Sequence, residues 1–190
     1  MKFLTVLCLA AVSILLVGCK ETPPKTRVQV FSIGQSALND NSNLIYNYGG
    51  HAIRIDDGTA VLRMFRISNG TKTQEAEQLL DSSKHPMAWI TPRVSGKDVE
   101  VEFGYSEQIG GSHRLGTISR VIFKSPHLVG SNTKHSSLTV EDEQKVLFQF
   151  WIMNEEGVDI NAAEDGSENA MLNTSKTKPA DFLLVTIASN

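Results

Sequence analysis

Residues 51–68, HAIRIDDGTAVLRMFRIS, are the clearest guide to the fold class. Two runs that contain β-branched and other apolar residues, 51–56 and 59–68, lie on either side of Asp57-Gly58. An Asp-Gly pair supplies the positive φ angles that a tight hairpin turn needs. The stretch therefore predicts two antiparallel strands joined by a hairpin turn.

Further strand signals lie on both sides of this stretch. Residues 27–33 are rich in β-branched and aromatic side chains, and residues 98–105 alternate strictly between apolar and polar or small side chains, which is typical of a half-buried strand. Residues 117–124 are its expected hairpin partner. Residues 145–153 and 182–188 are apolar on both faces, which predicts two central strands.

One segment has a helical pattern. Residues 71–83, TKTQEAEQLLDSS, follow the turn signal Asn69-Gly70 and begin with Thr71 and Gln74 at the spacing of a capping box. We expect a short helix here that covers one end of the core.

These elements predict an all-β fold. About eight strands, one short helix and no alternation of strands with helices favour a β-sandwich or barrel-like antiparallel fold. Trp89 and Trp151 lie in apolar strand context and are expected in the core.

The N-terminal segment has the layout of a secretory signal. Lys2 precedes residues 3–18, which carry no charge and are shorter than the roughly 20 apolar residues of a spanning helix. The segment ends in Leu16-Val17-Gly18-Cys19, which resembles the lipobox of bacterial lipoproteins. An uncleaved anchor or an ordinary signal peptide with a chance cysteine are the alternatives.

The resemblance implies that Cys19 carries a lipid and that the chain is cleaved after Gly18. Residues 1–18 are then a lipoprotein signal peptide, residues 19–26 the lipidated cysteine with a short tether, and residues 27–190 a single β-rich domain. The implied location is the bacterial cell envelope, lipid-anchored and extracytoplasmic. Lys20 resembles the residue after the cysteine in lipoproteins sorted to the outer membrane of diderm bacteria.

Charge and cysteine content exclude several functions. The chain has 18 basic and 21 acidic residues, a formal net charge of −3, which argues against nucleic acid as a partner. Cys8 lies in the signal segment and a lipid would occupy Cys19, so no thiol remains for a disulfide, a zinc site or a nucleophile. We expect no cofactor.

Two loops are candidate binding regions. Tyr46 and Tyr48 follow the amide-rich residues SALNDNSN, a composition suited to recognising a peptide or a glycan. His113 and Arg114 are expected at the tip of a hairpin loop over residues 108–116, where they could contact a partner. The partner would be the membrane, through the lipid, and another envelope protein or a glycan.

Motifs for catalysis and metal binding are incomplete, so no catalytic residue and no metal ligand is assigned. The glycines at 111 and 116 lack the lysine of a phosphate loop, and Ser131-Asn-Thr-Lys134 lacks the other elements of penicillin-recognising enzymes. The acidic loop 154–169 does not fit the EF-hand template. We therefore expect a non-enzymatic binding or structural module. An envelope hydrolase with a dispersed active site and a calcium- or metal-dependent adhesion-type module using loop 154–169 are the alternatives.

Overall fold

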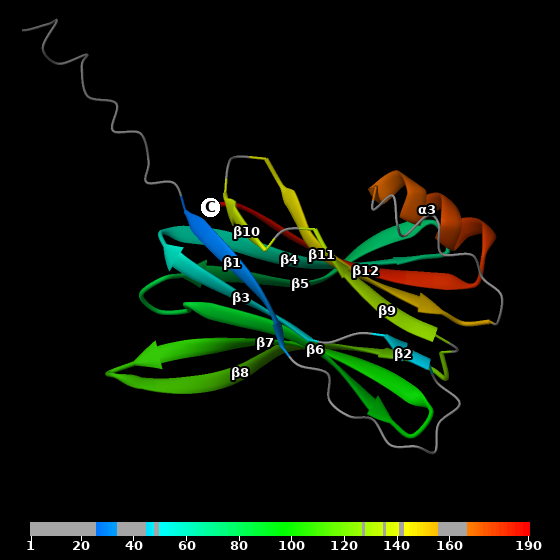
Figure 1. Cartoon of the computed structure of the whole chain (residues 1–190), viewed down its shortest axis with the longest axis horizontal. Coiled ribbons are helices and arrows are strands. Elements are labelled where there is room, and N and C mark those ends of the chain that lie inside the picture. The colour runs from blue at the N-terminus through cyan, green and yellow to red at the C-terminus, as the bar shows by residue number, and fades with distance from the viewer. Residues whose placement is uncertain are drawn as a thin grey trace, which may run out of the picture.

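The fold is a sandwich of two six-stranded sheets (Figure 1). The computed structural model describes residues 26–33, 45–47, 50–126, 128–134, 136–140, 143–155 and 167–190. Within these ranges the chain forms twelve strands and one helix, so the prediction of an all-β sandwich with one short helix is confirmed, although it has twelve strands where about eight were expected.

Sheet A contains the N-terminal strand and two long hairpin-connected strands. All neighbours in it are antiparallel. Its strand order is β10 (Ser137–Thr139), β1 (Arg27–Ile33), β3 (Gly50–Asp57), β6 (Met87–Ser95), β7 (Asp98–Ile109) and β8 (Ser112–Phe123). The predictions for residues 27–33 and for the pairing of 98–105 with 117–124 are confirmed.

Sheet B contains the two strands that are apolar on both faces. Its order is β2 (Ile45–Asn47), β9 (Leu128–Thr133), β11 (Lys145–Met153), β12 (Ala180–Ser189), β4 (Thr59–Ser68) and β5 (Thr71–Asp81). All neighbours are antiparallel except β2 and β9, which are parallel. β11 and β12 are the two middle strands, as their sequence predicts.

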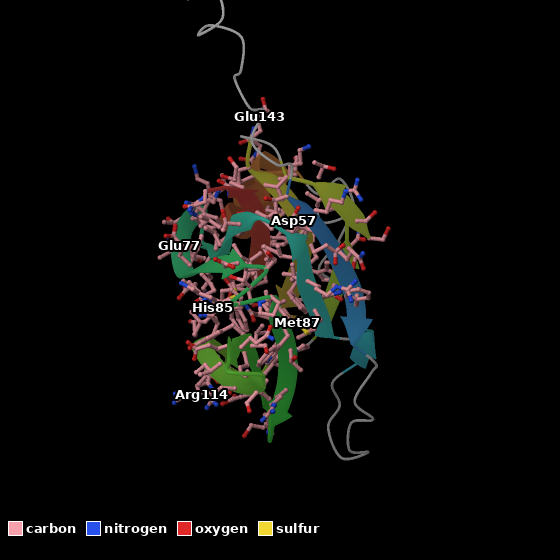
Figure 2. The ribbon with its side chains drawn as sticks, turned by 90° about the vertical axis from the view of Figure 1, so that its left-hand side faces the viewer. Asp57, Glu77, His85, Met87, Arg114 and Glu143 are labelled. Atoms are coloured by element: carbon pink, nitrogen blue, oxygen red, sulfur yellow. The ribbon has the colours of Figure 1, made fainter. Side chains whose placement is uncertain are left out.

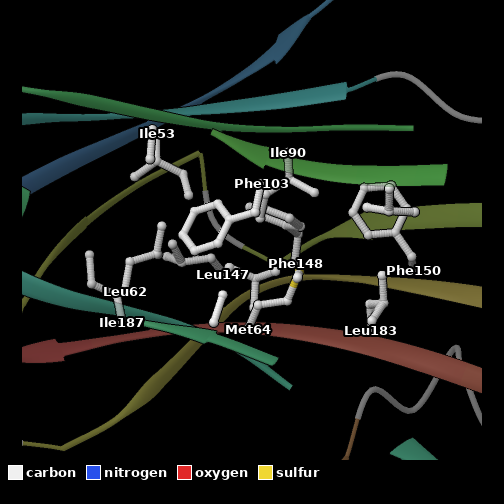
Figure 3. Packing of buried hydrophobic residues seen from close by; sticks show 14 of the residues in the cluster. Ile53, Leu62, Met64, Ile90, Phe103, Leu147, Phe148, Phe150, Leu183 and Ile187 are labelled. Carbon is white, nitrogen blue, oxygen red and sulfur yellow. The ribbon is translucent and has the colours of Figure 1, made fainter. Parts of the chain in front are cut away.

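The main core lies between the two sheets (Figure 3). Sheet A contributes residues such as Ile53 and Phe103, and sheet B contributes Leu62, Phe148 and Phe150, all of which are completely buried. Each such side chain stabilises the fold by about 1.5–3 kcal/mol relative to its exposed state. The sandwich therefore depends on the period-two alternation of its strands.

A second apolar cluster explains why β11 and β12 are buried on both faces. Helix α3 (Glu168–Thr177) lies on the face of sheet B that is turned away from sheet A (Figure 1). Its completely buried Met171 packs with Phe182 and Leu184 of β12 and with Met153 of β11. The side chain of Ser167 caps the helix by accepting a hydrogen bond from the amide of Ala170 (3.2 Å).

The stretch 51–68 forms two strands but not a hairpin. β3 belongs to sheet A and β4 to sheet B, so Asp57-Gly58 is a corner between the sheets. Gly58 has a φ of 77°, and the Thr26 hydroxyl donates to the carbonyl of Thr59 at 3.0 Å beside it. Gly58 supplies the positive φ that was expected. The chain nevertheless crosses from sheet A to sheet B at this point, because β3 pairs with β1 and β6 whereas β4 pairs with β12 and β5.

The predicted helix at residues 71–83 is wrong, because residues 71–81 form strand β5. Asn69 and Gly70 both have positive φ, 51° and 73°, and make a two-residue turn that pairs Ser68 with Thr71. Asn-Gly is the strongest short-range hairpin signal, and the pairing with β4 outweighs the helical propensity of the segment. The helix of the described residues lies instead at Glu168–Thr177 and begins within the acidic stretch 154–169 that was expected to be a loop.

Two smaller expectations also need correction. The hairpin between β7 and β8 has no loop over 108–116, since it closes at Gly110-Gly111, where both φ angles are positive, and pairs Ile109 with Ser112. Trp89 is not in the core, because it lies half-buried on the outer face of sheet A between the completely buried Ala88 and Ile90.

Candidate binding surface on sheet A

The face of sheet A that is turned away from sheet B is the main functional candidate. Strand alternation sends Ile53 and Ile55 of β3 into the core, and it sends Ala52, Arg54 and Asp56 outward. Helix α3 packs mainly on β4, β5 and β12, all in sheet B. Among the described residues, no helix covers this outer face.

A row of residues with aromatic and small side chains crosses four strands of this face. Phe31 of β1 pairs with Ala52 of β3, Ala52 pairs with Trp89 of β6, and Trp89 pairs with Gly104 of β7. The side chain of Phe31 is 41% exposed, and the indole of Trp89 occupies the space over Gly104. Two aromatic rings thus flank a floor of small residues.

Beside this row, three polar side chains hold one another in place. Arg54 donates from Nε to Asp56 (2.9 Å) and from Nη2 to the Gln29 side-chain oxygen (3.0 Å). The Gln29 amide donates to the other oxygen of Asp56 (2.7 Å), which closes a triangle. The guanidinium carbon of Arg54 also lies 5.4 Å from the centre of the Phe31 ring. The triangle and the ring therefore form one preorganised unit.

An open groove continues from the triangle to the edge of the sheet. Its volume is about 550 Å³. It is lined mainly by polar side chains of β1, β3 and β10: Arg27, Val28, Gln29, Asp56, Ser137, Leu138 and Thr139. The groove adds hydroxyl donors and acceptors to the aromatic row.

The charges toward the other edge of sheet A are also paired. Arg120 of β8 contacts Glu100 (3.3 Å) and Glu102 (3.1 Å), and Lys124 contacts Asp98 (2.7 Å). The hydrogen bond from Lys124, together with one from the backbone amide of Ser125, holds the pKa of Asp98 below its usual value. Cations and anions therefore alternate in this part of the face.

Those site residues expected from the sequence that the structure describes are not brought together by the fold. Tyr46 lies in β2 at one edge of sheet B, and Cys19 and Tyr48 lie outside the described residues. His113 and Arg114 lie at the start of β8, opposite Gln108 and Glu107. β2 pairs with Leu128, which follows the far end of β8, so the tyrosine and histidine regions lie at opposite ends of the sandwich.

Sequence reasoning misses Phe31, Arg54 and Trp89. The alternation in residues 51–57 does indicate that Arg54 points outward, but the pattern of one strand does not reveal its neighbours. The pairing of β1, β3 and β6 brings together Phe31, Ala52 and Trp89, which are far apart in the sequence, and only the register places them in one row.

A second polar group lies inside the sandwich. His51 of β3 is 5% exposed, and its ring nitrogens lie 3.3 Å from the hydroxyls of Ser131 and Thr133 on β9. Its ring also stacks near Phe148, with the centroids 4.6 Å apart. Burial lowers the pKa of His51 from 6.5, which favours the neutral ring. The contact links sheet A to sheet B.

The geometry of His51 suits a structural bridge better than a hydrolytic site. A serine activated by histidine needs a group on the second ring nitrogen that stabilises the imidazolium, usually a carboxylate. Here the hydroxyl of Thr133 lies at that nitrogen. Ser131 therefore faces a buried imidazole whose neutral form is favoured, and it lies within strand β9.

Possible metal ligands do not cluster in the described part of the chain. Among the described residues, no group of three or more His, Cys, Asp or Glu side chains could hold a metal ion. Most of the acidic loop 154–169, and His127 and His135, lie outside those residues. At the described C-terminal end of the acidic loop, Glu168 forms an ion pair with Lys72 of β5.

No family model, curated protein or solved structure matches this chain. In the described parts of the chain, no helix has the length and apolar character needed to cross a membrane. Function must therefore be inferred from the surface itself.

Proposed function

We propose that the protein is a lipid-anchored lipoprotein of the bacterial cell envelope that acts as a non-enzymatic binding module. In this proposal Cys19 carries the lipid, and the outer face of sheet A binds an extracytoplasmic partner. The observation that best supports this proposal is a contrast between the outer faces of the two sheets. Helix α3 covers part of the outer face of sheet B, whereas exposed aromatic and polar side chains occupy the outer face of sheet A.

The short tether supports this arrangement. Thr26 follows Cys19 by seven positions, a distance of about 25 Å at most when fully extended. Thr26 lies at the end of the sandwich that also contains the corner at Gly58, because its hydroxyl bonds to Thr59 and its carbonyl accepts from Val140 (2.8 Å). A lipid on Cys19 would hold this end near the bilayer.

The same geometry sets the direction of the binding face. β1 and β6 run away from the tethered end, and β3 and β7 run toward it. Figure 2 views the tethered end of the molecule, with Asp57, His85 and Arg114 all near the viewer. Sheet A would thus stand roughly upright on the membrane and present its outer face sideways to the surrounding envelope.

Labelling with a fatty-acid analogue tests the anchor. Cys19→Ala should lose the label and leave the membrane fraction, whereas Cys8→Ala, the matched control within the signal segment, should keep both. A Cys19→Ala variant that still carries the label would disprove the lipid site.

Site-specific photocrosslinking in native membranes tests the face. A crosslinker at Gln29 on sheet A should capture a partner reproducibly. One at Glu77, on the outer side of β5 in sheet B, serves as the control and should not. Equal capture from both positions would count against a binding role for sheet A.

A further inference from the structure

We propose that the partner of this face is an uncharged glycan that lies across strands β1, β3, β6 and β7 with its sugar rings against Phe31 and Trp89. The proposal rests on the proposed function in one respect, namely that the outer face of sheet A is the binding surface. It adds the chemical class of the ligand and the direction in which it lies.

The aromatic row matches the apolar faces of sugars. A pyranose ring presents a face of C–H groups that packs favourably on an aromatic ring. Phe31 and the ring of Trp89, which extends over Gly104, are separated by two to three strand spacings, or roughly 10 to 15 Å. This is about the length of two or three linked sugar rings.

The floor between the rings is low enough for an extended ligand. Ala52 lies between Phe31 and Trp89 in the same register row, and Gly104 continues the row on the next strand. Neither residue has a side chain larger than a methyl group. Gly104 lies beneath the Trp89 indole, so Ala52 is the one residue of the row between the two rings, and its methyl group leaves room for a chain of sugars to contact both.

The triangle of Gln29, Arg54 and Asp56 supplies hydrogen-bond donors and acceptors for sugar hydroxyls. The carboxylate of Asp56, the amide of Gln29 and the guanidinium of Arg54 are planar groups that can bond two neighbouring hydroxyls at once. Their mutual hydrogen bonds already fix their positions. Binding then requires little additional ordering of side chains, which lowers its entropic cost. Ser137 and Thr139 extend the set along the groove.

The charge pattern favours a neutral ligand. Arg54 is paired with Asp56, and Arg120 with Glu100 and Glu102, so charges of both signs are interspersed on this face, unlike the single-sign surface that attracts a polyanion. An extended peptide is disfavoured for a different reason. Such peptides usually add to a sheet edge through main-chain hydrogen bonds, whereas the aromatic row lies on a face.

The test uses the full lipidated protein in detergent, with cellohexaose and chitohexaose as probes and microscale thermophoresis as the readout. We expect at least one probe to bind, and its affinity to fall about tenfold or more in Phe31→Ala and in Trp89→Ala. Trp151→Ala, which removes the corresponding indole from sheet B, is the matched control and should bind as the unchanged protein does. Thermal melting of each variant separates lost binding from lost folding.

A second variant keeps the test independent of the tryptophan's structural role. Gln29 is half-buried at the surface, and Gln29→Ala should weaken binding while the melting temperature stays the same. Affinity should also change little between low salt and about 0.5 M salt, because screening weakens only charge-driven contacts.

Three outcomes would overturn the proposal. The first is that neither probe binds, and the second is that binding is lost steeply with salt, which would indicate an anionic polymer. The third is self-association that Phe31→Asp abolishes, which would make the face an interface between copies of this chain. If the crosslinker at Gln29 still captures a protein when neither sugar binds, the glycan proposal fails but the binding role of sheet A stands.

Discussion

The indole ring of Trp89 occupies the space over Gly104 on the neighbouring strand, where even a methyl group would collide with it. The same arrangement recurs in sheet B, where Trp151 lies over Gly130. Glycine weakens a strand because it has no side chain to pack. An aromatic ring from the next strand compensates for this, and the glycine in turn fixes where the ring lies.

Gly104→Ala should therefore displace the Trp89 ring and impair ligand binding. We expect destabilisation of about 1–3 kcal/mol from the forced overpacking, together with a change in tryptophan fluorescence. Gly130→Ala is the matched control, since it should destabilise the protein through Trp151 but leave binding intact. Denaturant titration and the oligosaccharide assay measure the two effects, and equal binding losses in both variants would contradict the assignment of the site to sheet A.

The buried His51 predicts a pH dependence of stability. Its folded-state pKa is below 6.5, so the unfolded chain binds more protons as the pH falls below about 6.5. The free energy of unfolding should therefore decrease from that pH downward and level off below the folded-state pKa. His51→Gln should remove this part of the pH dependence. Denaturation of both proteins between about pH 5 and pH 8 measures the difference, and parallel curves would refute the role of His51.

The two-residue turn at Asn69-Gly70 gives a test of local backbone strain. Gly70→Ala should cost about 1 kcal/mol or more, because φ is 73° and the new Cβ would lie 3.0 Å from Cβ of Lys176 in α3. Gly96→Ala has a similar φ of 65°, but the added Cβ has no described atom within 4 Å. The difference between their unfolding free energies isolates the contact with α3, and a larger loss in Gly96→Ala would argue against it.

Packing of α3 on sheet B should depend on one side chain. Met171 is completely buried, and Met171→Ala should lower the free energy of unfolding by about 2–5 kcal/mol. Asn173→Ala, on the exposed side of the same helix, should change it little. Urea denaturation provides the comparison. Similar small effects in both would mean that the helix contributes little to the fold.

Much of this fold can be predicted from side-chain alternation. β1 and β11 have the predicted bounds, and β12 lies in the centre of sheet B because its residues are apolar on both faces. The helix could not be placed, since residues 71–81 carry good helix formers and become a strand only through pairing with β4. Local propensity is weak compared with such tertiary contacts.

The binding surface could be predicted only in part. The outward direction of Arg54 follows from the sequence, but the row from Phe31 to Gly104 depends on the order of strands in sheet A. The corner at Gly58 is a second feature that the sequence predicts only in part. Its sequence specifies positive φ, and the choice between a hairpin and a change of sheet depends on which partners the two strands find.

Strand β1 has a mechanical consequence. It follows the segment that leads from Cys19, and its seven residues include both Gln29 and Phe31. Tension between a lipid anchor and a ligand held on sheet A would run along this single strand. Because the pull is parallel to the strand, the backbone hydrogen bonds of β1 with β3 would carry the load together in shear. Of the main hydrophobic core, β1 contributes Val28 and Val30, and the residues on other strands would then lie outside the path of the force.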